Sequence, residues 1–168
     1  MSILRIIDQW LIKILKFVVA LLLFLILLLT LIQVVFRYIL ILPSPWSEEL
    51  ARLGLVWIVF LAASLGVRLK SHPYLKLLVT RMSFKIKYTV FILIYLFMAV
   101  MGIVMVVYGV KYVGRTAGDY TTSLGYSRNL FYYPVPISGI FILIYSTGEM
   151  LQSIKAVLTG KEVERKDL

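Results

Sequence analysis

The chain alternates long apolar runs with short segments that carry most of its charges. Residues 17–36 and 88–110 are uncharged, and runs of this length cross a hydrocarbon core of about 30 Å as helices. The run at 53–67 is too short to cross at about 1.5 Å per residue, so that helix must extend at both ends. A fourth run follows two prolines near residue 135. The pattern predicts four transmembrane helices, at about 17–37, 47–69, 88–110 and 134–155.

The composition is that of an integral membrane protein. Hydrophobic residues make up 61% of the chain and charged residues 15%, against about 25% charged in a soluble domain. The connections between the runs are short, so we expect one all-α membrane domain over residues 1–168. The chain has no cysteine, which excludes disulfides, thiolate metal sites and cysteine catalysis.

Two basic segments outside the runs are predicted to lie at the bilayer surface. In residues 1–16, apolar side chains recur at helical spacing beside a basic stripe, which is typical of an amphipathic lead-in. The middle loop, 68–87, holds six basic residues and no acid, and its spacing predicts a short amphipathic helix facing anionic headgroups. His72, the only histidine, lies in this loop. A polar loop residue is favoured there over a ligand or a proton relay.

The distribution of positive charge predicts the orientation. With four crossings, the N-terminus, the middle loop and the C-terminal segment share one side, and they hold 13 of the 18 Lys and Arg residues. Because cytoplasmic loops are enriched in these residues, we expect both termini, including a solvated tail at 156–168, in the cytoplasm (N-in/C-in). The net charge of +10 follows these loops and does not indicate a nucleic-acid partner.

A charged cluster opens the second run, at residues 46–52. Ser47 is placed to cap a helix whose first turn carries Glu48 and Glu49, where the helix dipole favours carboxylates. Arg52 follows Glu48 by four residues, so these two side chains share a helix face. The segment therefore predicts a charged helix start at a membrane interface.

Arg37, at the end of the first run, is predicted to join this cluster. With the two acids and Arg52 it makes two positive and two negative charges in one hairpin, so we expect one charged network at the outer interface. Thr30, Gln33 and Arg37 share a helix face, which is either an interfacial polar edge or a packing contact to the acidic turn. Trp46 suits the interface, where its ring and its N–H each find a favourable solvent.

Glu149 is the most deeply placed acid in the predicted spans. An intramembrane carboxylate is a candidate functional residue. It lies 12 residues after Ile137, toward the basic side of the membrane, where Arg68 ends the second span. A structural ion pair with Arg68 is the favoured interpretation, and a proton or ion site is the alternative.

Small residues in the second span mark helix surface that is predicted to pack. In the second span, Gly54 and the pair Ala62 and Gly66 offer close-approach surface to another helix. In the third span, Gly102 and Gly109 lie seven residues apart on one face.

Several segments together resemble a known family. They are Gln33-Val34-Val35-Phe36-Arg37-Tyr38, Pro45-Trp46-Ser47-Glu48-Glu49-Leu50-Ala51-Arg52, Thr122-Ser123-Leu124-Gly125-Tyr126 and Tyr133-Pro134-Val135-Pro136-Ile137-Ser138-Gly139. The pattern resembles the small membrane subunit of tripartite ATP-independent periplasmic (TRAP) transporters, the DctQ-like family. One departure is Pro73-Tyr74-Leu75-Lys76, where that family more often carries an acid.

The resemblance implies a scaffold subunit in a bacterial inner membrane. Its expected partners are a large multi-span membrane subunit, which holds the substrate and sodium sites, and a periplasmic solute-binding protein that delivers an organic acid such as a sialic acid or a C4-dicarboxylate. The chain itself is then expected to need no cofactor and no metal. The expected mechanism is an elevator in which this subunit extends the static part.

Other classes of function fit the residues less well. A small multidrug exporter needs a carboxylate in its first span, and residues 17–36 have none. An intramembrane enzyme needs a nucleophile with a partnering base, and the serines of the spans read as packing hydroxyls, so no catalytic residue is predicted. The remaining alternative is a generic four-helix assembly or anchor subunit of another complex.

Overall fold

Four long helices form the fold in the computed structural model, which describes residues 2–69 and 83–159. They are α1 (Ser2–Tyr38), α2 (Pro45–Leu69), α4 (Phe84–Arg115) and α5 (Pro134–Thr159), and a short 3-10 helix, η1 (Arg128–Phe131), precedes α5. Each of the four is long and apolar enough to cross a membrane. An all-helical architecture with four helices of spanning length, as predicted, is confirmed.

α1 differs from the prediction at its beginning. It is one continuous helix of 37 residues, about 55 Å long at 1.5 Å per residue. The helix thus shows no break between the expected amphipathic lead-in at 1–16 and the span that follows, and a position of the lead-in at the bilayer surface stays a prediction. Residues 2–16 contain no proline or glycine, and extending an existing helix avoids the cost of nucleating a new one.

Parts of two other predictions lie outside the described residues. The expected amphipathic helix of the middle loop, with His72, falls mainly in residues 70–82, and most of the predicted tail falls in 160–168. The first residues of that tail, up to Thr159, continue α5.

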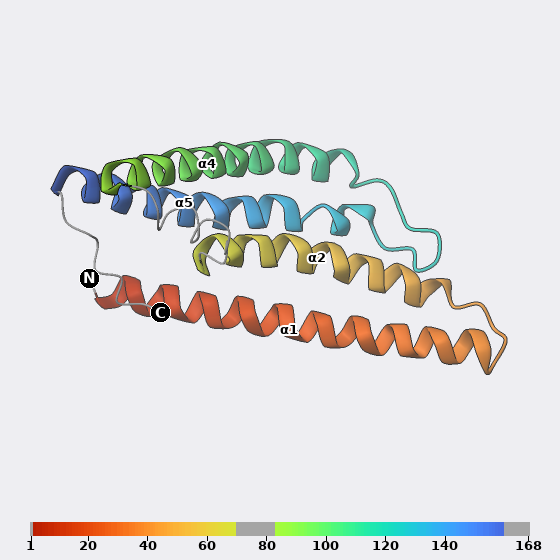
Figure 1. The fold of residues 1–168 in the computed structure, drawn as a ribbon. Helices are drawn as coiled ribbons and strands as arrows, with labels where there is room; N and C mark the ends of the chain where they lie inside the picture. Colours follow the sequence, from red (N-terminus) through yellow and green to blue (C-terminus); the bar gives the residue numbers. More distant parts are fainter. Residues whose placement is uncertain (1, 70–82, 160–168) are drawn as a thin grey trace.

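The helices lie side by side in the order α1, α2, α5, α4 (Figure 1). α1 packs on α2, α2 packs on α5, and α5 packs on α4, so the fold is a row of two helical hairpins. One end of the row holds the start of α1 and the end of α5, and we call it the terminal end. The other end holds the α1–α2 loop (39–44) and the α4–α5 loop (116–133), and we call it the loop end.

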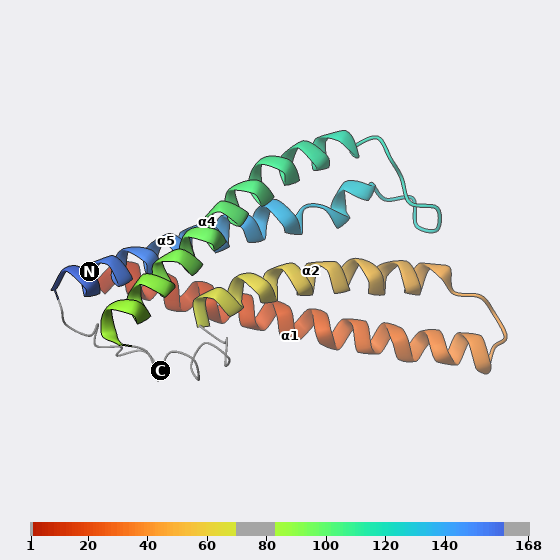
Figure 2. The ribbon, with the colours of Figure 1, turned by 45° about the horizontal axis from the view of Figure 1, so that its top comes forward.

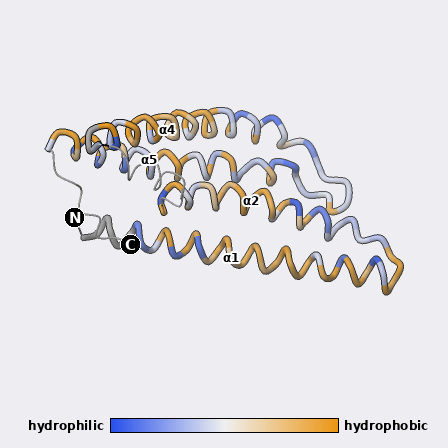
Figure 3. Tube along the Cα trace, in the orientation of Figure 1, coloured by the Kyte–Doolittle hydropathy of each residue, from blue (hydrophilic) through white to orange (hydrophobic). Residues whose placement is uncertain are grey.

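The distribution of hydrophobic and hydrophilic residues along the row is the one expected of a protein that crosses a bilayer. Most hydrophilic residues lie near the helix ends and in the α4–α5 loop, and the middles of the helices are apolar (Figure 3). A helix satisfies its own backbone N–H and C=O groups, so such a segment loses little when it leaves water. Many large apolar side chains are exposed on the row, for example Phe24, Leu93 and Ile144, and lipid or a partner helix can cover them.

α4 and α5 pack closely because glycines leave room for the facing helix. A Cβ added at Gly102 would lie 2.8 Å from Leu143 Cγ and 3.1 Å from the carbonyl oxygen of Gly139. At Gly109 it would lie 2.8 Å from Pro136 Cδ. The face that Gly102 and Gly109 share is thus the contact with α5.

The small residues predicted in α2 have mixed outcomes. At Gly54 an added Cβ would lie 3.0 Å from Ile26 Cγ1, so this glycine packs against α1 as expected. At Gly66 nothing lies within 4 Å of such a Cβ, so Gly66 is not at a helix contact within the described chain. The helical period places small residues on a face, but it does not say which face meets a neighbour.

Candidate functional site

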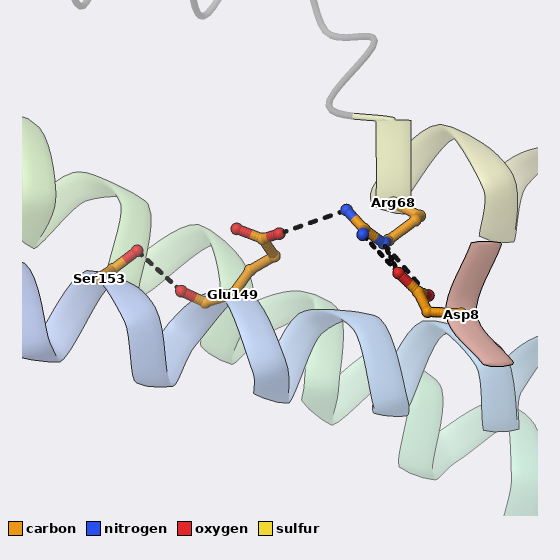
Figure 4. Close-up of polar contacts among 4 residues, drawn as sticks. All are labelled: Asp8, Arg68, Glu149 and Ser153. Carbon is orange, nitrogen blue, oxygen red and sulfur yellow. Dashed lines mark hydrogen bonds and ion pairs between the residues drawn. The ribbon is translucent and has the colours of Figure 1, made fainter. Parts of the chain in front are cut away.

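A charged cluster joins three helices at the terminal end of the row (Figure 4). Arg68, in the last turn of α2, lies between Asp8 of α1 and Glu149 of α5. Its guanidinium donates to Asp8 Oδ2 from Nε at 3.1 Å and from Nη2 at 2.5 Å, and Nη1 lies 3.9 Å from Glu149 Oε1. The predicted pairing of Arg68 with Glu149 is therefore confirmed, and Asp8 is an additional partner.

The burial of this cluster explains why the charges occur together. Glu149 is 7% exposed, and the side chains of Arg68 and Asp8 are 26% and 30% exposed. Charged groups this far out of water are strongly disfavoured unless an opposite charge compensates them. A guanidinium suits the position because its planar fork donates two hydrogen bonds to Asp8 while its third nitrogen forms an ion pair with Glu149.

Sequence reasoning missed Asp8 although a signal was present. Asp8 is the only acid in the first 47 residues, and it precedes the apolar run by nine positions. Because residues 1–16 were interpreted as a lead-in lying along the bilayer surface, no partner was predicted for Asp8. In the continuous α1 helix it faces the end of α2 instead. The structure thus brings two carboxylates to one guanidinium.

The charged segment at the loop end is arranged differently from the predicted network. Arg52 Nη2 donates to Glu48 Oε1 at 2.8 Å, and both side chains are more than half exposed. Arg37 instead lies over the ring of Tyr38, 5.9 Å from its centroid. Within the described residues Arg37 has no ion pair with either acid, so the four-residue network is wrong. The acids of α2 point in different directions, because neighbouring positions on a helix lie about 100° apart.

Other details of this segment are corrected as well. α2 begins at Pro45, so Ser47 lies inside its first turn and is not the cap; its hydroxyl donates to the carbonyl oxygen of Ser44 at 2.8 Å. Trp46 packs edge-on against Phe36, with ring centroids 6.2 Å apart. This aromatic contact, rather than a charged one, joins the ends of α1 and α2.

Within the described residues, no ion pair joins the polar face of α1 to the acidic turn. Thr30 donates its hydroxyl to the carbonyl oxygen of Ile26 in its own helix, at 2.8 Å. Its hydrogen-bonding capacity is thereby used locally. This local bond of Thr30 fits the interpretation of the face as a polar edge.

The α4–α5 loop reaches across to α2. The indole N–H of Trp57, in α2, donates to the carbonyl oxygen of Leu130, in η1, at 3.1 Å. In the same loop Tyr126 stacks on Phe131, with ring centroids 6.2 Å apart. Sequence reasoning predicted neither of these contacts, because a loop of glycine, threonine and tyrosine gives no period from which a contact can be predicted.

Comparison with known proteins adds the family. Residues 26–156 match the model of the DctQ component of tripartite ATP-independent periplasmic transporters. The chain belongs to the DctQ family. A curated relative is the sialic acid TRAP transporter small permease protein SiaQ of Vibrio cholerae serotype O1, which is 24% identical over 126 residues, covering 75% of this chain and 73% of the relative. Members of this family are transporter subunits and not enzymes.

The matched region relates the family to the two ends of the row. It includes the segment Trp46–Arg52, Arg68 and Glu149, but it begins after Asp8. The third member of the charged cluster thus lies outside the residues that the DctQ match covers. Family and helices together indicate a multi-pass protein of a bacterial inner membrane.

Proposed function

We propose that this chain is the small scaffold subunit of a TRAP transporter that takes up an organic acid. Its partners are a large membrane subunit, which carries the substrate and sodium sites, and a periplasmic solute-binding protein. The match to the DctQ component over residues 26–156 carries this proposal. A sialic acid or a C4-dicarboxylate is the proposed class of solute, and the first is the solute named for the Vibrio relative.

The structure supports a static role in two ways. The helices that it describes run without breaks across their apolar segments, whereas transporter binding sites are commonly built from discontinuous helices. The row is also tied at both ends, by the Asp8–Arg68–Glu149 cluster and by the bond from Trp57 to the α4–α5 loop. Such ties suit a subunit against which another one moves.

We propose further that the terminal end faces the cytoplasm. The reason is the distribution of basic residues, 13 of 18 of which lie on the side that holds both termini. The loop end then faces the periplasm, where a solute-binding protein arrives. Labelling single cysteines introduced at Leu124 and Gln152 with a membrane-impermeant reagent on intact cells tests this orientation. Leu124 should react and Gln152 should not.

Reconstitution in liposomes tests the transport function. The chain is purified together with its large membrane subunit and supplied with the solute-binding protein, a sodium gradient and labelled N-acetylneuraminate or succinate. Uptake is expected only when all three proteins are present. Sodium-dependent uptake by this chain alone, or undiminished uptake in its absence, would contradict the proposal.

A further inference from the structure

The α4–α5 loop contains a small hairpin with two different faces. Tyr120 pairs with Ser127 in an antiparallel bridge, and the N–H of Thr121 donates to the carbonyl oxygen of Tyr126 at 2.9 Å. The turn between them closes at Gly125, whose φ of +68° suits glycine. Residues opposite one another in such a pair project to the same side, and successive residues project to opposite sides. Thr121 and Tyr126 therefore share one face, and Tyr120 lies on the other.

Burial shows that the face with Thr121 and Tyr126 is turned inward. Thr121 is 8% exposed, whereas Tyr120 is 66% exposed. The loop lies beside the first half of α2 in both views of the ribbon (Figures 1 and 2). The bond from Trp57 of α2 to Leu130, just after the hairpin, fixes this approach.

Glu49 lies within electrostatic reach of Tyr126. Burial raises the pKa of the Tyr126 phenol above its ordinary value, and the negative charge of Glu49 raises it further. Glu49 is the acid of α2 that is not engaged in the exposed Glu48–Arg52 pair. A carboxylate in the first turn of α2 thus acts electrostatically on a phenol of the α4–α5 loop.

Two buried oxygen atoms at this contact are chemically complementary. Within the described chain, Glu49 Oε2 and Tyr126 Oη are both buried and have no hydrogen-bond partner. Buried polar groups almost always find a partner, because leaving one unpaired is costly. The phenol is a donor and the carboxylate is an acceptor, so a single bond satisfies both.

We propose that the Tyr126 hydroxyl donates a hydrogen bond to the Glu49 carboxylate and that this bond latches the α4–α5 loop onto the first turn of α2. The two helical hairpins diverge toward the loop end (Figure 2). The latch lies across this divergence and fixes the hairpins relative to one another. It also orients the exposed side of the loop, which carries Tyr120 and Leu124. This inference holds independently of the transported solute and of the partner subunits.

Side-chain variants of the full chain that keep the size of the side chain nearly constant test the latch. Tyr126→Phe removes only the hydroxyl, Glu49→Leu removes the acceptor at similar size, and Glu49→Gln keeps an uncharged acceptor. The matched controls are Tyr120→Phe, on the other face of the hairpin, and Glu48→Gln, at the neighbouring acid.

The readout is the distance between spin labels on cysteines introduced at Leu124 and Leu55. Both positions are exposed, and the chain has no cysteine of its own. A hydrogen bond to a charged group shifts an equilibrium by roughly 10- to 100-fold. Tyr126→Phe and Glu49→Leu should therefore broaden the distance distribution clearly, Glu49→Gln should do so less, and both controls should match the unmodified chain.

A double variant separates the latch from general loosening. Tyr126→Phe combined with Glu49→Leu should broaden the distribution no more than either single change, because each alone removes the same bond. A distribution unchanged by Tyr126→Phe would overturn the proposal. Additive effects of the two changes would overturn it as well.

Discussion

Replacing Asp8 by asparagine should weaken the tie between α1 and the rest of the row. The change keeps the size of the side chain and removes the negative charge that the Arg68 guanidinium contacts at 2.5 and 3.1 Å. A hydrogen bond to a charged group contributes about 1.5–3 kcal/mol. Because both side chains are about one quarter exposed, solvent screening favours the low end, and we expect a loss of about 1–2 kcal/mol.

Thermal unfolding in detergent, followed by tryptophan fluorescence, measures this loss. For a chain of this size 1 kcal/mol corresponds to about 2–4 °C, so Asp8→Asn should lower the melting temperature by about 2–8 °C. Asp119→Asn is the matched control, since Asp119 is exposed in the α4–α5 loop, and surface changes of this kind usually stay within about 0.5 kcal/mol.

A double-mutant comparison with Arg68 decides whether the lost ion pair causes the destabilisation by Asp8→Asn. In a chain that already carries Arg68→Gln, the further change Asp8→Asn should have almost no effect, because the charge it removes no longer has its partner. An equal loss with and without Arg68 would refute the reasoning. So would an unchanged melting temperature for Asp8→Asn alone.

Four further substitutions probe the helix contacts, the buried acid and the loop end. Gly102→Ala should destabilise the chain by about 1–3 kcal/mol, because its Cβ meets the backbone of α5. Gly66→Ala should leave stability unchanged or raise it by up to about 1 kcal/mol, since Gly66 faces open space; equal melting temperatures for the two alanine variants would contradict the packing. Glu149→Gln should lower the stability of the purified complex and leave the sodium dependence of uptake unchanged, and a lost sodium dependence would instead make Glu149 a coupling site. The raised pKa of Tyr126 means that its contribution to stability is present below pH of about 10 and is lost as pH rises through the higher folded value. Glu49→Gln should lower the pKa of Tyr126 toward its ordinary value. The titration is followed by NMR of labelled tyrosine, and the signal of Tyr126 is assigned as the one that disappears in Tyr126→Phe. An unchanged titration in Glu49→Gln would show that Glu49 does not act on the phenol.

The helices were predictable because their signal is strong and local. A run of 20 or more uncharged residues between charged ends has one stable arrangement in a bilayer. The pairing of Arg68 with Glu149 was also predictable. Counting residues along the second and fourth spans places both side chains at a similar depth, toward the basic side of the membrane. That Gly102 and Gly109 share one face followed from helical spacing alone, whereas the helix that they meet did not.

The parts that failed depend on how helices are rotated and where they continue. Asp8 was missed because the start of α1 was read as a separate surface segment. Glu48 and Glu49 are neighbours in sequence, yet one pairs in solvent with Arg52 and the other faces the α4–α5 loop. Composition cannot separate two such acids, because the difference arises from the direction of each side chain on the folded helix.

The orientation of the loop hairpin also could not be predicted. Its register depends on the Tyr120–Ser127 bridge and on the turn at Gly125, and a register shift of one residue would expose Tyr126 instead of burying it. Nothing in the local sequence excludes that shift. The aromatic contacts with Phe131 and the bond from Trp57 to Leu130 select the observed register through tertiary packing.

The distance between α2 and α5 during transport tests the scaffold role most directly. Spin labels on cysteines introduced at Leu55 and Ile144, both exposed on their helices, report this distance in the reconstituted complex with the large subunit. We predict the same distance distribution without solute, with sodium alone, and with sodium, solute-binding protein and acid together, while uptake proceeds. A change of several ångströms that accompanies transport would show that the row itself moves, and would contradict a static scaffold.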